Sequence, residues 1–339
     1  MRAPEFWAGR GPWATSMPPL LSPLSGLYDG LGRLRRALAS PESVDVPVIC
    51  VGNVVSGGAG KTPTALGIAA RLAARGLRPH FLSRGYGGRL RGPVQVDPAR
   101  HATALVGDEP LLLAARAPTW VARQRPAGAR AAVAAGAEVL VMDDGHQNPD
   151  LQKDLSLIVV DAAYGFGNGR VMPAGPLREP PAVGLGRADG VVLIEGAGTL
   201  SGLDAEIAAL APDRPLLRAR LEPSISALPL AESAVVAFAG IGRPEKFFAT
   251  LEELGCQIVG RHAFADHQPY DPDTLMRIVE EAAAKGARPV TTAKDAVRLP
   301  PEARAMVEVV EVGIVFAEET AIEALLEGAL APFRTEAAP

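Results

Sequence analysis

The stretch VVSGGAGKTPTALG, residues 54–67, decides the fold class of this chain. Its GKT triplet at 60–62 matches the end of the phosphate-binding pattern G-x-x-x-x-G-K-[ST], but Val55 stands where that pattern begins with glycine. Gly57 and Gly58 lie inside the loop instead, and small residues there let backbone N–H groups approach phosphate oxygens. The stretch therefore predicts a nucleotide site despite the missing glycine.

The residues on either side of this loop have the patterns of a strand and a helix. The run 44–54 is apolar and β-branched, like a buried parallel strand, and apolar residues recur at helical spacing over 66–73. We predict that Lys61 reaches the β- and γ-phosphates and that the Thr62 hydroxyl binds Mg²⁺. A glycine-rich turn without a ligand is the alternative, which the strand–loop–helix order disfavours. The predicted nucleotide-binding residues are Ser56, Gly57, Gly58, Ala59, Gly60, Lys61, Thr62 and Pro63.

The composition predicts a chain that folds around an ample core. Its 339 residues are 48% hydrophobic and 21% charged, which suggests two domains or one large domain. The net charge of −4 gives no general case for nucleic-acid binding. Cys50 and Cys256 are far apart in apolar runs, which disfavours a disulfide scaffold or a cysteine metal site and favours a reducing compartment.

The first 40 residues have the pattern of a basic amphipathic helix. Five arginines stand against two acidic residues, and no run of 18 or more apolar residues or secretory signal is present. Such a helix suits a lipid headgroup layer, while packing of its leucines on the protein's own core is equally compatible with the residues alone. The leucines that share one predicted face are Leu24, Leu27, Leu31, Leu34 and Leu38.

Strand-like and helical runs alternate along the chain, which predicts an α/β fold with a mainly parallel sheet. The predicted strands of the first domain are 78–83, 119–123, 137–143, 155–161 and 188–195. The chain then breaks at APDRP, and a second α/β series follows. Its last helix is predicted over 318–330, and the sequence does not indicate whether this helix packs on the first domain. The predicted division is an N-terminal helix over 1–40, a phosphate-loop domain over 41–212, a second smaller domain over 213–332 and a disordered tail over 333–339.

Two acidic pairs are candidates for the chemistry. Asp143 and Asp144 end an apolar strand, where two adjacent acids are costly unless a cation such as Mg²⁺ is present, although an Asp-Asp-Gly turn is the alternative. Asp108 and Glu109 either cap a helix with Pro110 in its first turn or supply the base that takes a proton from an acceptor hydroxyl. Spacing alone favours the cap slightly.

Three further segments place polar residues in loops, at 82–92, 165–180 and 264–271. Arginines in the first can bind phosphate in a planar fork, unless the loop is only flexible and solvated. A loop as long as the second is either functional or disordered. A histidine in the third can share a proton with a carboxylate, although a lone surface histidine is the commoner outcome. The candidates in these segments are Arg84, Tyr86, Asn168, Arg178, Glu179 and His267.

Together these motifs resemble the tetraacyldisaccharide 4′-kinase family, the lipid A 4′-kinases, from the N-terminal helix to about residue 316. The resemblance implies that ATP donates its γ-phosphate to the 4′-hydroxyl of a tetraacyldisaccharide 1-phosphate, a late step in lipid A biosynthesis. It implies a peripheral or monotopic protein on the cytoplasmic face of the bacterial inner membrane, with no obligate protein partner and no nucleic acid. The segments that carry it are VGNVVSGGAGKTP, LSRGYGG, GDEP, DDGHQNPDL, GNGRVMPAGPLREP, FAGIGRPEKFF, FADHQPYD and TTAKDAVRL.

The resemblance also implies roles for the candidate residues. Asp108 becomes the base and His267 its dyad partner, and the family shares the missing first glycine. The implied catalytic residues are Asp108, His267, Lys61 and Arg178. The implied Mg²⁺-binding residues are Thr62, Asp143, Asp144 and Glu109. The implied substrate-binding residues are Arg84, Tyr86, Gln147, Asn168 and Glu179.

One motif departs from the family pattern. The family usually reads D-D-G-F-Q-H, whereas this chain has His146 in place of the phenylalanine and Asn148 in place of the final histidine. Gln147 is retained. Asn148 can supply an oxygen or a weaker hydrogen bond, and His146 is left without a catalytic role.

Two other functions are compatible with a phosphate loop. A nucleotide-switched partner-binding protein would hydrolyse nucleotide when a protein partner binds and would have no lipid acceptor; the lack of an N-K-x-D motif counts against GTP. A cytosolic small-molecule kinase would leave the leucine- and arginine-rich N-terminus without a purpose beyond packing.

Overall fold

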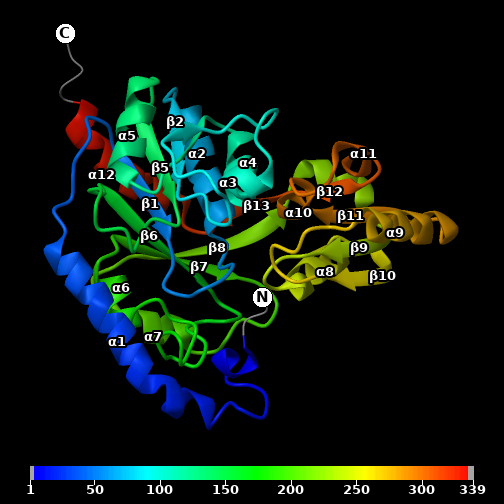
Figure 1. The fold of residues 1–339 in the computed structure, drawn as a ribbon, viewed down its shortest axis with the longest axis horizontal. Helices are drawn as coiled ribbons and strands as arrows, with labels where there is room; N and C mark the ends of the chain where they lie inside the picture. Colours follow the sequence, from blue (N-terminus) through cyan, green and yellow to red (C-terminus); the bar gives the residue numbers. More distant parts are fainter. Residues whose placement is uncertain (1–3, 335–339) are drawn as a thin grey trace.

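The computed structural model describes residues 4–334 and shows a large and a small α/β unit side by side (Figure 1). In the described residues, the strands of the large sheet are, in spatial order, β13 (Val312–Phe316), β8 (Leu216–Pro223), β7 (Gly190–Glu195), β6 (Leu155–Asp161), β1 (Val48–Gly52), β5 (Val139–Asp143), β2 (Pro79–Ser83), β4 (Thr119–Val121) and β3 (Val94–Gln95). All neighbours are parallel except the two edge strands, β13 and β3, which confirms the predicted mainly parallel sheet.

Helices cover both faces of this sheet. They are α2 (Lys61–Ala74), α3 (Thr103–Val106), α4 (Asp108–Ala114), α5 (Arg125–Ala134), α6 (Pro181–Gly186), α7 (Leu203–Leu210) and α12 (Glu319–Arg334). In β1, Ile49 and Val51 pack into one core with α2 and α12, while Cys50 packs into another with α5. Burial on both faces explains why the predicted strands read as continuous apolar runs.

The small unit is a parallel sheet with helices on both faces. Its strands are, in spatial order, β10 (Gln257–Ala263), β9 (Ala234–Ala239), β11 (Arg288–Thr292) and β12 (Glu308–Val310). Its helices are η2 (Ile225–Leu230), α8 (Pro244–Glu253), α9 (Pro272–Ala284), α10 (Ala293–Ala296) and α11 (Pro301–Arg304). Phe248 of α8 packs into the core on one face, and Leu275 and Ile278 of α9 pack into the core on the other.

The division between the two sheets differs from the predicted domain boundary at residue 212. β8, predicted to open the second domain, extends the large sheet beside β7. β13 then returns to the large sheet and pairs with β8, with Val312 opposite Pro223. The small unit is therefore an insertion between β8 and β13, and the pairing that makes it one joins residues too distant in sequence for a local pattern to reveal.

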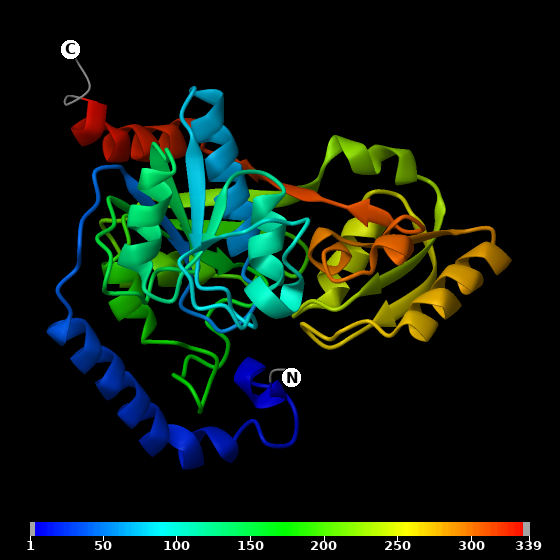
Figure 2. The same cartoon turned by 45° about the horizontal axis from the view of Figure 1, so that its top comes forward.

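The last helix packs on the large unit, a question that the sequence leaves open. Ile322 and Leu326 of α12 lie in the same core as β1 and α2, and Figure 2 shows the helix beside that unit. α12 continues to Arg334, so the start of the predicted tail over 333–339 is helical, and residues 335–339 lie outside the described residues. The C-terminal helix thus belongs to the phosphate-loop unit and not to the small unit.

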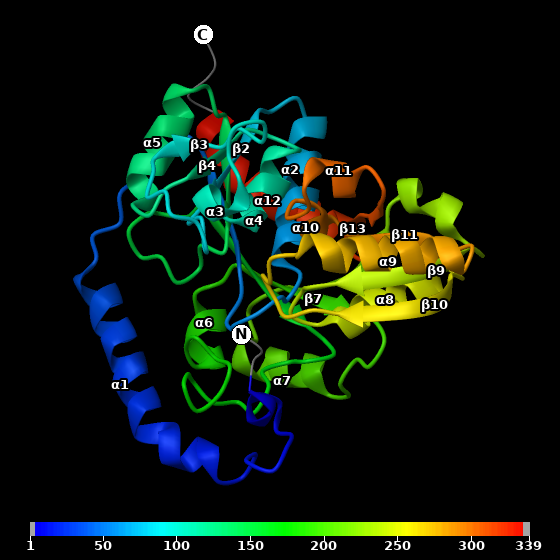
Figure 3. The ribbon, with the colours of Figure 1, turned by 45° about the vertical axis from the view of Figure 1, so that its right-hand side comes forward.

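The N-terminal segment forms η1 (Glu5–Ala8) and α1 (Met17–Leu38), and α1 lies along the outside of the large unit (Figure 3). The predicted leucine face points away from the protein: Leu27 is 62% exposed, Leu31 59% and Leu38 76%. These exposures contradict the alternative in which the leucines pack on the protein's own core. Among residues 4–334, no helix is both long enough and apolar enough to cross a bilayer.

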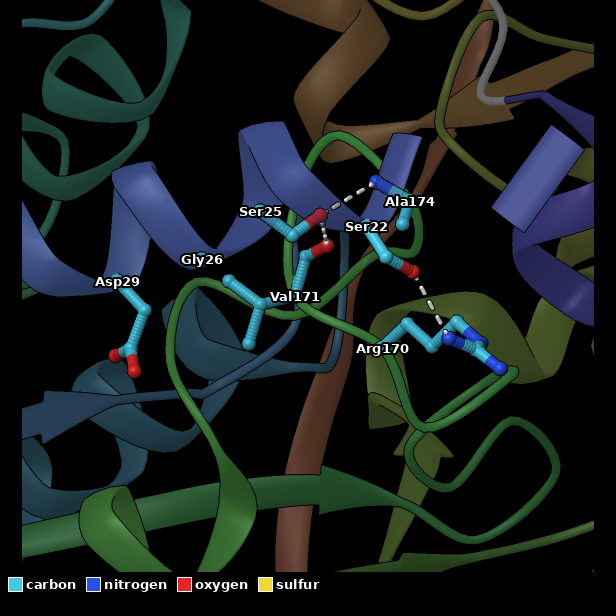
Figure 4. Close-up of a pocket in the computed structure, with 7 residues that line it drawn as sticks. All are labelled: Ser22, Ser25, Gly26, Asp29, Arg170, Val171 and Ala174. Carbon is cyan, nitrogen blue, oxygen red and sulfur yellow. Dashed lines mark hydrogen bonds between the residues drawn. The ribbon is translucent and has the colours of Figure 1, made fainter. Parts of the chain in front are cut away.

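The other side of α1 is attached to the long glycine- and proline-rich loop between β6 and α6 (Figure 4). Ser25 Oγ donates a hydrogen bond to Val171 O at 2.7 Å and accepts one from Ala174 N at 3.1 Å. Arg170 Nη1 donates to Ser22 Oγ at 3.0 Å. Polar contacts therefore fix one side of the helix to the loop, while its leucines are left uncovered.

Candidate active site

The carboxyl ends of the parallel strands in the two units face each other. In the large unit, the phosphate loop follows β1, Asp143 ends β5 and Asp161 ends β6. In the small unit, Arg243, His267 and Lys294 follow β9, β10 and β11. Hydrogen bonds and ion pairs join the two sets across the junction. Open parallel sheets bind ligands beyond the carboxyl ends of their strands, so this junction is the candidate active site.

The predicted nucleotide-binding residues, 56–63, form the loop between β1 and the first turn of α2. Gly57 and Gly60 have φ angles of 121° and 88°, which side chains rarely adopt, and a Cβ on Gly60 would lie 2.3 Å from Ile194 Cδ1. α2 begins at Lys61, so the free N–H groups of a helix N-terminus lie beside the loop. This is the backbone arrangement that binds phosphate groups.

The chain path before the loop shows how a valine is accommodated where the usual pattern has glycine. Val55 is 8% exposed and forms an antiparallel bridge with Leu177 of the long loop. Ser56 N donates a hydrogen bond to Pro176 O at 2.7 Å. The valine side chain packs into the apolar core below, so the first part of the phosphate loop is held by pairing with a second loop.

Lys61 lies folded over its own loop. It is 8% exposed, and its Nζ donates to Gly57 O at 3.3 Å and lies 3.8 Å from Asp144 Oδ1. A buried ammonium needs such partners because desolvation otherwise disfavours its charge. The phosphates of a nucleotide would offer the same group stronger acceptors.

Asp143 carries a carboxylate oxygen without a protein partner. The residue is 1% exposed; Oδ2 accepts a hydrogen bond from Thr62 Oγ1 at 3.0 Å, and Oδ1 is buried and unpaired. Burial, followed by the nearby charge of Glu109, raises the pKa of Asp143 to about 7. An orphaned carboxylate oxygen beside a threonine hydroxyl fits Mg²⁺, which would restore the ionised form.

The predicted metal residues do not form a preassembled cage. Among residues 4–334, no group of three or more histidine, cysteine, aspartate and glutamate side chains is arranged to hold a metal ion. Mg²⁺ usually takes one or two carboxylates and fills its other positions with water and substrate oxygens. Glu109 forms an ion pair with Lys294 Nζ of the small unit at 3.6 Å, and its charge also acts on Asp143.

Asp144 is held by an arginine fork. Arg178 Nη1 and Nη2 donate to its two carboxylate oxygens at 2.6 and 2.9 Å, and its backbone has a φ of 57°. Burial opposes ionisation, but Lys61 and Arg178 outweigh it and keep the pKa of Asp144 well below its usual range. Asp144 is therefore ionised and positions two predicted catalytic cations, Lys61 and Arg178. Its backbone conformation is one that residues other than glycine rarely adopt.

Asp108 and His267 come together across the two units. His267 Nδ1 donates to Asp108 Oδ2 at 2.8 Å, and Asp108, the first residue of α4, is 5% exposed. Burial raises the pKa of Asp108, but the hydrogen bond from His267 and the charge of Lys294 outweigh it and lower that pKa overall. The Tyr86 ring centroid lies 5.9 Å from that of His267. Asp108 is thus an ionised acceptor at neutral pH.

Arg84 and Tyr86 remain available to a substrate. Both side chains are exposed, and Tyr86 is 69% exposed. They follow β2, whose carboxyl end lies in the same sheet as the ends of β1 and β5. Exposed polar residues on a loop that reaches His267 suit recognition of a large acceptor.

Glu179 is the centre of a buried charge network. It is 1% exposed, accepts bonds from Arg187 Nη2 at 2.7 and 2.6 Å, and lies 3.3 Å from Arg36 Nη1 of α1. Gln147 Nε2 donates to it at 3.0 Å, while Gln147 Oε1 accepts from Arg178 at 3.3 Å. Its carboxylate is fully occupied by protein groups, so Glu179 supports the site and does not offer a free group to a substrate.

Three further polar residues from the predicted motifs serve the local structure. Asn168 Nδ2 donates to Phe6 O at 3.0 Å and Ala174 O at 2.9 Å. Asn148 Oδ1 accepts from the backbone at Asp150 at 3.2 Å. His146 is 2% exposed, and burial lowers its pKa to about 3; its ring nitrogens lie 2.9 Å from Ser156 Oγ and 3.1 Å from Gly184 O. The two family departures therefore shape turns and packing.

One inter-unit cluster was not predicted. Asp161, which is 4% exposed, forms ion pairs with Arg243 and Lys246 of the small unit. No sequence pattern links this aspartate, which follows an apolar strand, to the two cations in GRPEKFF. Only the fold brings the three residues together. Glu109–Lys294 and Asp108–His267 are further ion pairs that join the two units here.

Comparison with known proteins identifies close relatives over nearly the whole chain. Residues 17–331 match the family described as Tetraacyldisaccharide-1-P 4′-kinase. The tetraacyldisaccharide 4′-kinase of Rhodospirillum rubrum is 55% identical over 333 residues, covering 96% of this chain and 97% of the relative. That of Rhodospirillum centenum is 52% identical over 330 residues, covering 96% of each.

A solved structure has the same architecture. The crystal structure of LpxK from Aquifex aeolicus in complex with ATP is 25% identical and superposes with a TM-score of 0.70. The match covers 92% of this chain and 99% of that one, so it includes both units. The nucleotide in that complex is ATP.

Proposed function

The chain belongs to the tetraacyldisaccharide 4′-kinase family, and from this premise we propose how its own residues perform the transfer. The protein is an ATP-dependent kinase of lipid A biosynthesis that phosphorylates the 4′-hydroxyl of a tetraacyldisaccharide 1-phosphate. This membership sets aside a nucleotide-switched partner-binding protein and a cytosolic small-molecule kinase. The single observation that supports our assignment of roles is the 2.8 Å bond between Asp108 and His267 beside the phosphate loop.

In the proposed mechanism, Asp108 accepts the proton of the 4′-hydroxyl. Its lowered pKa keeps it ionised, and the Nδ1–H of His267 holds one of its oxygens in place. Lys294 Nζ lies 3.4 Å from His267 Nε2, so a cation is positioned on the far side of the imidazole. Positioning and charge stabilisation supply most of the rate in phosphoryl transfer, and a proton acceptor completes the set.

The loop cations contact the phosphates of ATP in this proposal. Lys61 exchanges Gly57 O for the β- and γ-phosphates, while Arg178 keeps Asp144 fixed beside it. Thr62 and Asp143 would hold Mg²⁺, which, when bound, neutralises charge on the phosphates. Arg84 and Tyr86 are proposed to contact the acceptor, because both are exposed in the loop after β2 and Tyr86 lies against His267.

We further propose that α1 binds the membrane surface from which the lipid acceptor comes. An exposed row of leucines beside basic residues suits the headgroup layer. The location is the cytoplasmic face of the bacterial inner membrane, with peripheral attachment through this helix. ATP is available there, and the active site is tied to the helix through the loop that follows β6.

The test of the function is transfer of labelled γ-phosphate from ATP to a tetraacyldisaccharide 1-phosphate in detergent micelles. We expect labelled lipid from the wild-type protein and no labelled lipid from a matched acceptor whose 4′-hydroxyl is methylated. Release of labelled inorganic phosphate with both lipids left unlabelled would refute the proposed acceptor chemistry.

Membrane attachment is tested by placing charge in the exposed leucine row. We expect the double variant Leu27→Glu, Leu31→Glu to bind anionic phospholipid vesicles about 100-fold more weakly, since each buried leucine contributes roughly 1.5 kcal/mol or more. Vesicle flotation measures the binding. Leu228→Glu is the matched control, because Leu228 is 55% exposed in the small unit. Equal flotation of the double variant and the wild type would exclude this face as the membrane contact.

A further inference from the structure

The ion-pair cluster at the end of β6 has an uneven charge. Asp161 is the only carboxylate that the described residues pair with Arg243 and Lys246, and it is 4% exposed. Two cations on one carboxylate leave a surplus of one positive charge. Burial, followed by repulsion from Arg243, lowers the pKa of Lys246 to about 7, and burial lowers that of Arg243 to about 10. A nearby anion would relieve both groups.

The phosphate loop lies next to this surplus charge. Arg243 Nη2 donates to Gly58 O at 3.2 Å, and its guanidinium carbon lies 5.4 Å from the centroid of the Tyr164 ring. The backbone before it is also close: a Cβ on Gly242 would lie 3.8 Å from Gly58 N. The turn between β9 and α8 therefore lies directly against the loop that receives the triphosphate.

Arg243 can leave this cluster without leaving the buried Asp161 carboxylate unpaired. A buried carboxylate that loses its only partner is strongly destabilised. Here Lys246, in the first turn of α8, stays on Asp161 when Arg243 turns away. The arginine is thus the cation that is free to change partners, and its planar fork suits phosphate oxygens better than an ammonium does.

We propose that Arg243 is a further catalytic residue, an arginine supplied by the small unit that binds the γ-phosphoryl group during transfer. The inference rests on the proposed function. The bond between Pγ and the β,γ-bridging oxygen breaks, the bond from the 4′-oxygen to Pγ forms, the hydroxyl proton goes to Asp108, and ADP leaves. Arg243 forms no covalent bond; it stabilises the charge on the equatorial oxygens.

The same contact links nucleotide binding to the position of the base. His267 belongs to the same unit as Arg243 and holds Asp108 of the other unit. A triphosphate that holds Arg243 at the loop therefore also favours the contact between His267 and Asp108. ADP lacks the γ-phosphate and leaves Arg243 on Asp161 and Gly58.

Equilibrium binding tests this inference without turnover. Calorimetric titration with ADP and with a non-hydrolysable β,γ-methylene analogue of ATP gives the preference for a triphosphate. We expect Arg243→Ala to weaken that preference about 10-fold, because Lys61 still contacts the γ-phosphate, with Arg243→Lys intermediate. In a separate turnover assay we expect Arg243→Ala to lower kcat by about 10³-fold. Arg261→Ala is the matched control, since Arg261 forms an exposed ion pair with Glu252 in the same unit. Triphosphate preference and kcat within threefold of wild type in folded Arg243→Ala would overturn the inference.

A second variant separates this role from mere docking of the two units. If Arg243 only anchors Asp161, then Asp161→Asn and Arg243→Ala should lose the triphosphate preference to the same extent. If it binds the γ-phosphate, Asp161→Asn keeps the preference. Failure of the lipid-kinase assignment would appear separately, as absent lipid labelling by the wild type while nucleotide preference persists.

Discussion

Replacing Asp108 with asparagine is expected to lower kcat for lipid phosphorylation by about 10³-fold, within the range for loss of a general base. Asparagine keeps the shape of the side chain, so the 5% exposed position stays filled. It cannot accept a proton, and its amide would turn the His267 imidazole to the wrong tautomer. The measurement is single-turnover transfer of labelled phosphate, with the Tm of each variant as a check on folding.

His267 provides the second half of this test. His267 has a φ of 59°, which asparagine tolerates better than other replacements, so His267→Asn removes the imidazole with little backbone strain. Because the two residues act as one unit, the double variant should be no slower than Asp108→Asn alone within a few-fold. If the fold-losses in kcat of the two single variants multiplied in the double variant, Asp108 and His267 would have independent roles. His262→Asn is the matched control, since His262 makes a similar 2.8 Å contact with Glu281 away from the site.

Replacing Lys61 with alanine is expected to have an effect of similar size. Its ammonium is proposed to stabilise the negative charge on the γ-phosphate in the transition state. Loss of one such preorganised donor reduces kcat by about 10²–10³-fold. The fold should survive, because Asp144 keeps both bonds from Arg178 when Lys61 is removed. ATP binding and lipid labelling are both measured. Lys285→Ala, which removes an exposed lysine paired with Glu281, is the control.

Either of two results would contradict the role of Lys61. Near-normal turnover would show that the buried lysine only ties its own loop together through Gly57. Loss of turnover together with a collapse of Tm would show a structural role. A loss confined to turnover and ATP affinity is the expected pattern.

The sequence was sufficient for elements whose signals are local. β6 begins and ends where its apolar run does, at Leu155 and Asp161, and the phosphate loop lies between strand and helix as its glycines predict. The strand near Thr119 is shorter than predicted, because only three residues pair with β2. Local propensity defines such segments well and their ends less well.

Features made by distant residues were missed. The boundary at residue 212 failed because β8 and β13 pair with each other from opposite sides of the inserted unit. Glu179 was predicted to bind the substrate, but it is buried and paired with Arg36 and Arg187, and no local pattern links these three positions. The contact between Asp108 and His267, in contrast, was predicted, but only through the family resemblance. Spacing alone favoured a helix cap for Asp108.

The way the small unit is inserted limits how it can move. The chain leaves the large unit at Pro223 and re-enters it at Val312, and these residues are partners in one antiparallel ladder. Ser224 N also donates a hydrogen bond to Glu311 O at 2.9 Å, so the two segments that connect the units are bonded to each other. The two chain crossings therefore form one paired attachment and not two independent linkers. This single attachment helps to fix where His267 and Arg243 lie relative to the large unit.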